Sequence, residues 1–264
     1  MKKTLIALMA LASVAMGDTK TEWTMSELAQ AATNSNKATI SEEWVYDGGD
    51  VYSFSNGSYL GGISDADLNA LFTGTDGTCI TIAAWVRVDS LSGYQAIFGY
   101  GAQNDGCVFT LHGSNLLYTS KGVNERGAAP SQLEAGEWGI VALTFIQGSK
   151  EGINAETGEP TYTPANGRYQ DAVGGYYTRQ VGSFKTPADA DQLFSIGSGN
   201  GISSRDSFTG EIAGLTIFSG TTTSVAPSTI IAKLGSAPVQ IPEPTTATLS
   251  LLALAGLAAR RRRK

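Results

Sequence analysis

Apolar and polar residues alternate along residues 79–88, and this is the most regular pattern in the chain. The apolar positions are Ile80, Ile82, Ala84, Val86 and Val88, and between them lie Thr81, Ala83, Trp85 and Arg87. A period of two predicts a strand with one well-buried face. A glycine-containing turn at 89–93 leads into a second apolar stretch that ends at Gly101, so we expect a hairpin. A buried sheet face needs a second layer, and we therefore predict a two-sheet sandwich.

Further short apolar stretches follow the same plan, each separated from the next by Gly, Asn, Asp or Ser. They cover residues 57–62, 107–111, 116–120, 139–145, 169–184, 193–197 and 208–218. The stretch 139–145 is apolar on both faces, which predicts a central strand. Residues 147–166 contain Pro160 and Pro164, which exclude a central strand, and we expect a long connection there. The predicted fold is all-β, an antiparallel two-sheet jelly roll with at most two short helices.

Two segments carry helix signals. Thr24 followed by Glu27 forms a capping box, and Trp23 with Leu28 fits a hydrophobic staple, so a short helix is expected to reach about residue 32. A second helix is expected over residues 227–234, capped by Ser224 or Ala226 and ended by Gly235. Residues 65–71 are compatible with a helical turn.

Composition agrees with a turn-rich β protein. The chain has 264 residues and 32 glycines, or about 12% against a usual ~7%, and its charged fraction of 16% lies below the usual ~25%. This length fits one large β domain.

The two ends differ from the rest of the chain. Residues 1–17 combine Lys2 and Lys3 with an apolar run and small residues, which predicts a secretory signal peptide. Residues 245–259 form a second apolar run, followed by a basic cluster at 260–264. As a helix this run is about 22 Å long, against a bilayer core of ~30 Å, so it predicts a short membrane segment with its basic end in the cytoplasm. An ordinary C-terminal anchor is the alternative.

These boundaries divide the chain into a signal peptide (1–17), a helical lead-in (18–37), the sandwich domain (38–235), a linker (236–244) and a membrane helix with a basic tail (245–264). Without the basic residues of the two ends, 11 of the 18 remain against 24 acidic residues. This negative charge would repel a phosphate backbone, so nucleic acid is excluded as a partner.

Pro242, Glu243 and Pro244 stand directly before the apolar run and its basic cluster. This order of three features resembles the PEP-CTERM sorting signal of Gram-negative bacteria. The resemblance implies recognition of Pro242, Glu243 and Pro244 by an exosortase-type enzyme. It also implies removal of the tail from an inner-membrane intermediate, and delivery to the outer surface or the extracellular matrix.

The strands at 81–86, 138–145 and 208–218, the last followed by a short helix, resemble the laminin G-like branch of the concanavalin A-like lectin/glucanase sandwiches over about residues 38–235. The long segment 148–166 departs from that branch. The resemblance implies a carbohydrate-binding or glucan-cleaving domain. Glucanases of this kind place paired carboxylates on one strand, and no such run is present, so we expect no catalysis. His112, the single histidine, has no partner at triad or metal spacing and is expected at the surface.

The resemblance also suggests a structural calcium ion, because laminin G-like domains often hold one with an aspartate just before a strand. Asp105 occupies such a place. A calcium site needs six to eight oxygen ligands, of which Asp105 is one, and a simple turn aspartate is the alternative. No other cofactor is expected.

Cys79 and Cys107 are the two cysteines. Export permits a disulfide between them. In a simple meander, however, they would lie about 9.6 Å apart, beyond the ~7 Å limit between Cα atoms, unless the strands cross between sheets. The sequence alone therefore leaves both states, a disulfide and two free thiols, as alternatives.

Several tyrosines are expected at strand ends or in loops, where their rings could stack on sugars or plug the ends of the sandwich. They are Tyr94, Tyr100, Tyr118, Tyr162, Tyr169, Tyr176 and Tyr177. Two hypotheses follow. The chain is an exported, non-catalytic glycan-binding or adhesion module, or it is a structural matrix protein without a small ligand.

Overall fold

The structure is a computed structural model. It describes residues 20–73, 79–102, 105–113, 115–120, 129–130, 133–146, 150–153, 160–162, 166–170, 176–180, 193–198, 207–220 and 225–242. The signal peptide, residues 245–264, and the two motif residues Glu243 and Pro244 lie outside these ranges. No helix within the described ranges is long and apolar enough to cross a membrane.

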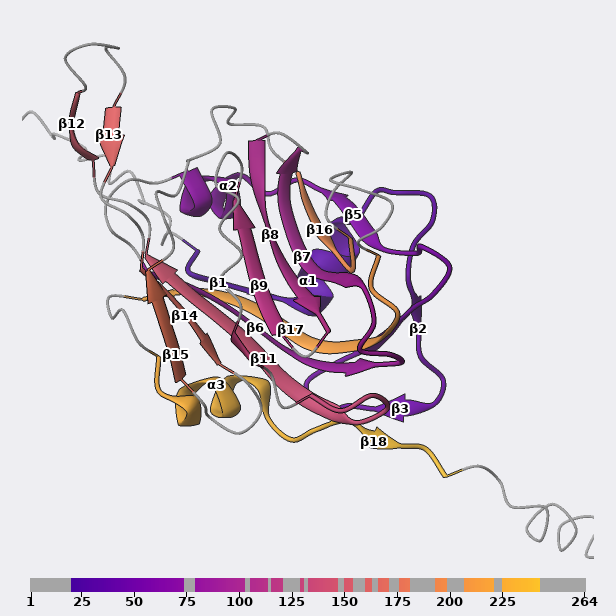
Figure 1. Cartoon of the computed structure of the whole chain (residues 1–264). Coiled ribbons are helices and arrows are strands. Elements are labelled where there is room, and N and C mark those ends of the chain that lie inside the picture. Colours follow the sequence, from indigo (N-terminus) through magenta and orange to yellow (C-terminus); the bar gives the residue numbers. More distant parts are fainter. Residues whose placement is uncertain are drawn as a thin grey trace, which may run out of the picture.

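Two antiparallel sheets form the sandwich (Figure 1). The eight-stranded sheet has the order β15 (Tyr176–Gln180), β14 (Asn166–Gln170), β11 (Trp138–Ile146), β6 (Cys79–Val88), β17 (Gly210–Gly220), β4 (Val51–Phe54) and β2 (Thr39–Ile40), and β1 (Glu22–Thr24) also pairs with β17. The six-stranded sheet has the order β10 (Ala129–Pro130), β9 (Asn115–Ser120), β8 (Asp105–His112), β7 (Tyr94–Ala102), β16 (Phe194–Ile196) and β5 (Leu60–Ile63).

Two small ladders complete the described strands. β12 (Lys150–Ile153) pairs with β13 (Pro160–Tyr162), and β3 (Trp44–Val45) pairs with β18 (Val239–Gln240). β12 and β13 lie within the long connection predicted at 147–166 and join neither main sheet, which agrees with the exclusion of a central strand there.

The core lies between the two main sheets. The alternating apolar residues of β6 all belong to it, and they pack with fully buried aromatic residues, among them Phe54, Phe98, Phe109, Phe194 and Phe208. The period-two pattern therefore identified the buried face correctly. The predicted central strand at 139–145 is also confirmed, since β11 lies between β14 and β6.

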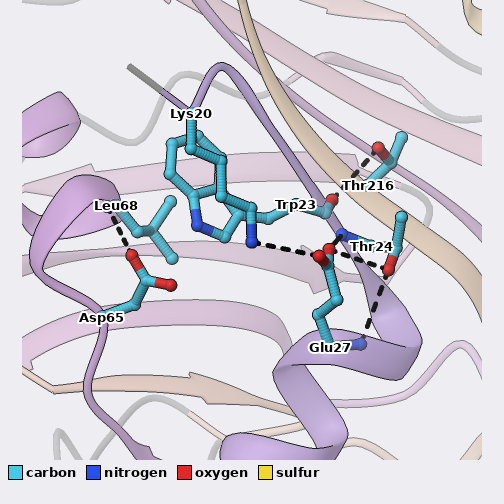
Figure 2. A network of polar contacts seen from close by, with 7 residues as sticks. All are labelled: Lys20, Trp23, Thr24, Glu27, Asp65, Leu68 and Thr216. Atoms are coloured by element: carbon cyan, nitrogen blue, oxygen red, sulfur yellow. Dashed lines mark hydrogen bonds and ion pairs between the residues drawn. The ribbon is translucent and has the colours of Figure 1, made fainter. Parts of the chain in front are cut away.

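Three short helices are described, one more than the sequence predicts. α1 (Met25–Ala31) begins with the predicted capping box: the backbone N–H of Thr24 donates to Glu27 Oε2 at 2.8 Å, and Thr24 Oγ1 accepts from the N–H of Glu27 (Figure 2). The third helix is α2 (Ala66–Thr73), where Asp65 Oδ1 accepts the N–H of Leu68 at 2.8 Å. α3 (Pro227–Leu234) ends at Gly235, as predicted, and Ala226 caps it without a side-chain hydrogen bond.

The predicted hairpin over 79–101 is wrong. β6 is hydrogen-bonded to β11 on one edge and β17 on the other, so no edge is left for β7. β7 pairs with β8 and β16 in the opposite sheet, and residues 89–93 carry the chain from one layer to the other.

Other strands differ in extent from the prediction. β2, β3, β4 and β18 were not predicted, and the single strand expected over 169–184 is two paired strands, β14 and β15. Residues 239–240, predicted to be linker, form β18. The sequence signal is weak in each case because these strands are short, two to five residues each.

Candidate functional site

The side of the eight-stranded sheet that faces away from the core carries a second set of side chains. Register places Trp138, Arg87 and Glu211 in one row across β11, β6 and β17. The next row contains Ile140, Trp85 and Ala213. Successive side chains of a strand point to opposite faces, so Thr81, Ala83, Trp85 and Arg87, which alternate with the apolar core positions of β6, belong to this outer face.

One half of the outer face is covered. Ile230 and Leu234 of α3 pack on Ala83, Ala142 and Phe218, and Figure 1 shows α3 lying against this sheet, opposite β8 and β9. The hydroxyl of Tyr46 donates to the carbonyl of Leu234 and ties the end of α3 to the segment after β3. The covered half of the outer face therefore serves to pack α3 on the sheet.

The other half is aromatic and partly open. Trp44 of β3 meets Trp138 edge to face, with ring centroids 5.4 Å apart and an interplanar angle of 82°. The guanidinium carbon of Arg87 lies 5.2 Å from the Trp44 ring centroid. All three side chains are half-buried. We call Trp44, Trp138, Arg87 and Glu211 the aromatic site.

Arg87 is the centre of the polar contacts of the aromatic site. Its Nη1 lies 2.8 Å from Glu211 Oε2 and 3.8 Å from Asp89 Oδ1, and its Nε donates to the carbonyl of Gly136 at 2.8 Å. Burial raises the pKa of the Glu211 carboxyl, and the Arg87 guanidinium opposes this by favouring the charged form. The negative charges of Asp89 and Glu43 push the pKa of Glu211 further upward.

Three indole N–H groups beneath this surface are buried. The nitrogens of Trp44, Trp85 and Trp138 have no hydrogen-bond partner in the described part of the chain. A buried donor without an acceptor costs free energy, so these indole groups lower the stability gained from packing this surface.

The sorting motif begins at the edge of the same surface. Val45 and Trp44 of β3 pair with Val239 and Gln240 of β18, and the N–H of Ile241 donates to the carbonyl of Glu43 at 2.8 Å. Pro242, the first residue of the motif, follows directly and is exposed. The predicted linker is thus hydrogen-bonded to the domain up to the residue before the motif.

The remaining predicted site residues lie apart from the aromatic site. Tyr100 is fully buried in the core and its hydroxyl donates to Asn69 Oδ1 at 2.5 Å, so of the two alternatives for this ring, packing inside the sandwich holds and stacking on a sugar does not. Tyr94 stacks on His112 with centroids 3.9 Å apart and an angle of 7°, and both are half-buried. For the other tyrosines, Tyr118, Tyr162, Tyr169, Tyr176 and Tyr177, the structure describes the strand but not the side chain.

The metal and disulfide predictions fall at the ends of β8 and β6. Asp105 and Cys107 lie on β8, and their side chains are outside the described part. Within the described ranges, no group of three or more His, Cys, Asp and Glu side chains is arranged to hold a metal ion. Cys79 is a buried thiol, and burial raises its pKa. β6 and β8 belong to opposite sheets, and because the side chain of Cys107 lies outside the described part, the Cys79–Cys107 bridge stays a prediction.

Comparison with known proteins gives two matches. Residues 60–225 match the laminin G-like profile of the concanavalin A-like lectin/glucanases superfamily. The chain belongs to this superfamily. Residues 240–264 match the PEP-CTERM protein-sorting motif. No curated protein matches the chain.

Solved structures resemble the chain at low identity. The NanB sialidase of Streptococcus pneumoniae aligns with 69% of this chain and 27% of its own length, at 14% identity and a TM-score of 0.47. The CBM40 domain of the Ruminococcus gnavus IT-sialidase, bound to alpha2,3 sialyllactose, aligns with 75% of this chain and 97% of its own, at 11% identity and a TM-score of 0.44. Domain 4 of the arabinanase AbnA from Geobacillus stearothermophilus, in complex with arabinotriose, aligns with 81% of this chain and 97% of its own length, at 14% identity and a TM-score of 0.42.

Sequence reasoning did not single out the aromatic site. Trp85 and Arg87 were visible as the bulky outward positions of an otherwise small-residue row, and Trp138 stands at the start of a strand. Their proximity to Trp44 depends on the β3–β18 ladder, which has no periodic signal.

Proposed function

We propose that the chain is an exported surface protein whose lectin-like sandwich binds carbohydrate without cleaving it. In this proposal the apolar run 245–259 holds the precursor in the inner membrane of a Gram-negative cell. An exosortase then acts at Pro242, Glu243 and Pro244 and delivers the domain to the outer surface or matrix. Membership of the lectin/glucanases superfamily and the match to the sorting motif support the two halves of this proposal.

The observation that carries the binding function is the aromatic site. Indole faces stack on the apolar faces of sugar rings, and charged groups beside them hydrogen-bond to hydroxyls. Trp44 and Trp138 are half-exposed and lie next to the charged pair of Arg87 and Glu211, which provides both kinds of contact within one patch.

Binding is tested with the full-length protein purified in detergent, on a glycan array in the presence of calcium and of a chelator. Trp44→Ala should weaken binding to the recognised glycan roughly tenfold, and Trp44→Tyr should retain most of it, since a ring face remains for stacking. Loss of binding in the chelator would support a calcium ion held with Asp105. An array without any bound glycan would favour the structural matrix protein.

The same residues explain why we propose no catalysis. A glycosidase needs one carboxyl that delivers a proton and a second that acts independently of it. Arg87 lies within 4 Å of both Glu211 and Asp89, so these two carboxyl groups share one guanidinium and do not act independently of each other.

We expect no release of reducing sugars from common β-glucans. Release that persists with fresh protein preparations and disappears in Glu211→Gln would contradict this expectation. Glu134→Gln, which changes an exposed residue outside the aromatic site, is the matched control.

A further inference from the structure

The ribbon formed by β3 and β18 has an apolar outer face. Val45 and Val239 are register partners, and Ile241, whose N–H donates to the carbonyl of Glu43, follows Val239 at the two-residue spacing of side chains on one face of an extended chain. These three side chains are 55%, 68% and 41% exposed. Trp44, which alternates with Val45, packs inward on Trp138. We call Val45, Val239 and Ile241 the apolar ribbon face.

This face stands immediately before the segment that enters the membrane in the proposed function. Among the described residues Ile241 is the last that is hydrogen-bonded to the domain, and three residues, four Cα-to-Cα steps, lead from it to Thr245, the start of the apolar run. Pro242 and Pro244 favour an extended chain of about 3.1 Å per residue, so the connection spans about 12 Å.

The apolar run is too short to span the bilayer core. Its 15 residues give about 22 Å of helix against ~30 Å of hydrocarbon. If the basic cluster 260–264 stays at the cytoplasmic surface, the outer end of the run lies about 8 Å inside the hydrocarbon. The 12 Å connection then places Ile241 about 4 Å above the hydrocarbon boundary, inside a headgroup layer that is roughly 6 Å deep.

We propose that the apolar ribbon face rests on the lipid surface of the membrane while the tail is inserted. The inference rests on the proposed function, because it needs the apolar run in the bilayer. Burial of Val45, Val239 and Ile241 among acyl chains and headgroups supplies the favourable contact.

Charge does not hold the domain there. Glu42, Glu43, Asp47 and Asp50 are exposed near Trp44 and Val45, and they repel anionic headgroups. The three apolar side chains are therefore the sole attraction between the domain and the lipid, and the domain stays on the membrane only while the inserted tail holds it there. Removal of the tail releases the domain from the membrane as well as from its anchor.

The test uses the full chain with Cys79→Ala and Cys107→Ala, reconstituted into vesicles of equal parts phosphatidylethanolamine and phosphatidylglycerol. The lipids are brominated near the glycerol end of the acyl chains and quench an environment-sensitive fluorophore placed by Val239→Cys. Leu193→Cys, 42% exposed and next to β16 of the other sheet, is the matched control. Leu254→Cys reports insertion of the tail. Unchanged thermal unfolding midpoints show that the labelled variants fold.

We expect quenching at 239 and 254, with roughly a twofold loss of emission at 239, and none at 193. Quenching at 254 with equal emission at 239 and 193 would overturn the ribbon contact and leave the proposed function intact. No quenching at 254 would overturn membrane insertion of the tail, and the ribbon contact with it.

Discussion

Gly210 shows how a single residue lets two central strands meet. It is the first residue of β17, its φ is +132°, and it pairs with Val88 of β6. A Cβ atom at this position would collide with the carbonyl oxygen of Arg87 and lie 3.0 Å from Cα of Val88. Both neighbours are backbone atoms, which cannot rotate away.

Gly210→Ala should therefore lower the free energy of unfolding by more than about 2 kcal/mol, through steric overlap and an unfavourable φ. Gly220→Ala, at the other end of the same strand, should change it by less than about 0.5 kcal/mol, because no atom lies within 4 Å of the added methyl group. Urea denaturation followed by circular dichroism measures both. Equal effects of the two substitutions would contradict the steric argument.

Residue types alone did not reveal which single side chains are exposed. Tyr100 was expected at a strand end, where its ring could stack on a sugar or plug the sandwich, but it faces the core from β7 and its ring lies 4.5 Å from that of Phe194, centroid to centroid. His112 was expected at the surface and is half-covered by Tyr94. Exposure at strand ends depends on the opposite sheet, which local patterns do not specify.

The elements divide into those with a local signal and those without one. The capping box of α1, the glycine stop of α3 and the buried face of β6 could be predicted because neighbouring residues determine them. The partner of β6 could not, since the turn at 89–93 fits a hairpin and a crossing between sheets equally well. The aromatic site was missed for the same reason, as it forms only where β3, β6, β11 and β17 come together.

At the level of one helix, Thr24→Ala should lower the free energy of unfolding by about 1 kcal/mol, because the N–H of Glu27 loses its acceptor. The backbone N–H of Thr24 lowers the pKa of Glu27, so the folded state holds this carboxyl charged more strongly than the unfolded state. Its contribution is complete above the ordinary value of 4.5 and is lost as pH falls through the lower, folded value.

Glu27→Gln provides the control for this pH dependence. Glutamine keeps an acceptor for the N–H of Thr24 but does not titrate, so the variant should lose less stability than the unchanged protein when the pH is lowered below 4.5. Denaturation at several pH values measures the difference. Identical acid sensitivity of the two proteins would rule out a contribution of Glu27.

For the whole molecule, the composition of residues 240–264 was enough to predict the sorting motif that the comparison finds there, and the other segment boundaries stay predictions. The acidic domain is joined to the sorting motif through α3 and β18, which return across the outer face of the eight-stranded sheet. The sequence did not predict this return, and it replaces a free linker with a ladder that places Pro242, the first residue of the motif, at one edge of the domain. An enzyme that acts on the motif must therefore approach Pro242 beside the ribbon of β3 and β18.

The last prediction concerns the tail. A 15-residue apolar run is only marginally long enough to anchor a protein in the bilayer, so we expect residues 245–264 to be a temporary membrane anchor that is removed by processing. Protein recovered from the cell surface should lack peptides from this segment by mass spectrometry, and Glu243→Ala should leave the full-length chain in the inner membrane. Glu42→Ala, an exposed acidic residue close to the ribbon, should be sorted normally. Intact tail peptides in the surface fraction would identify an ordinary anchor, and normal sorting of Glu243→Ala would contradict recognition of the motif.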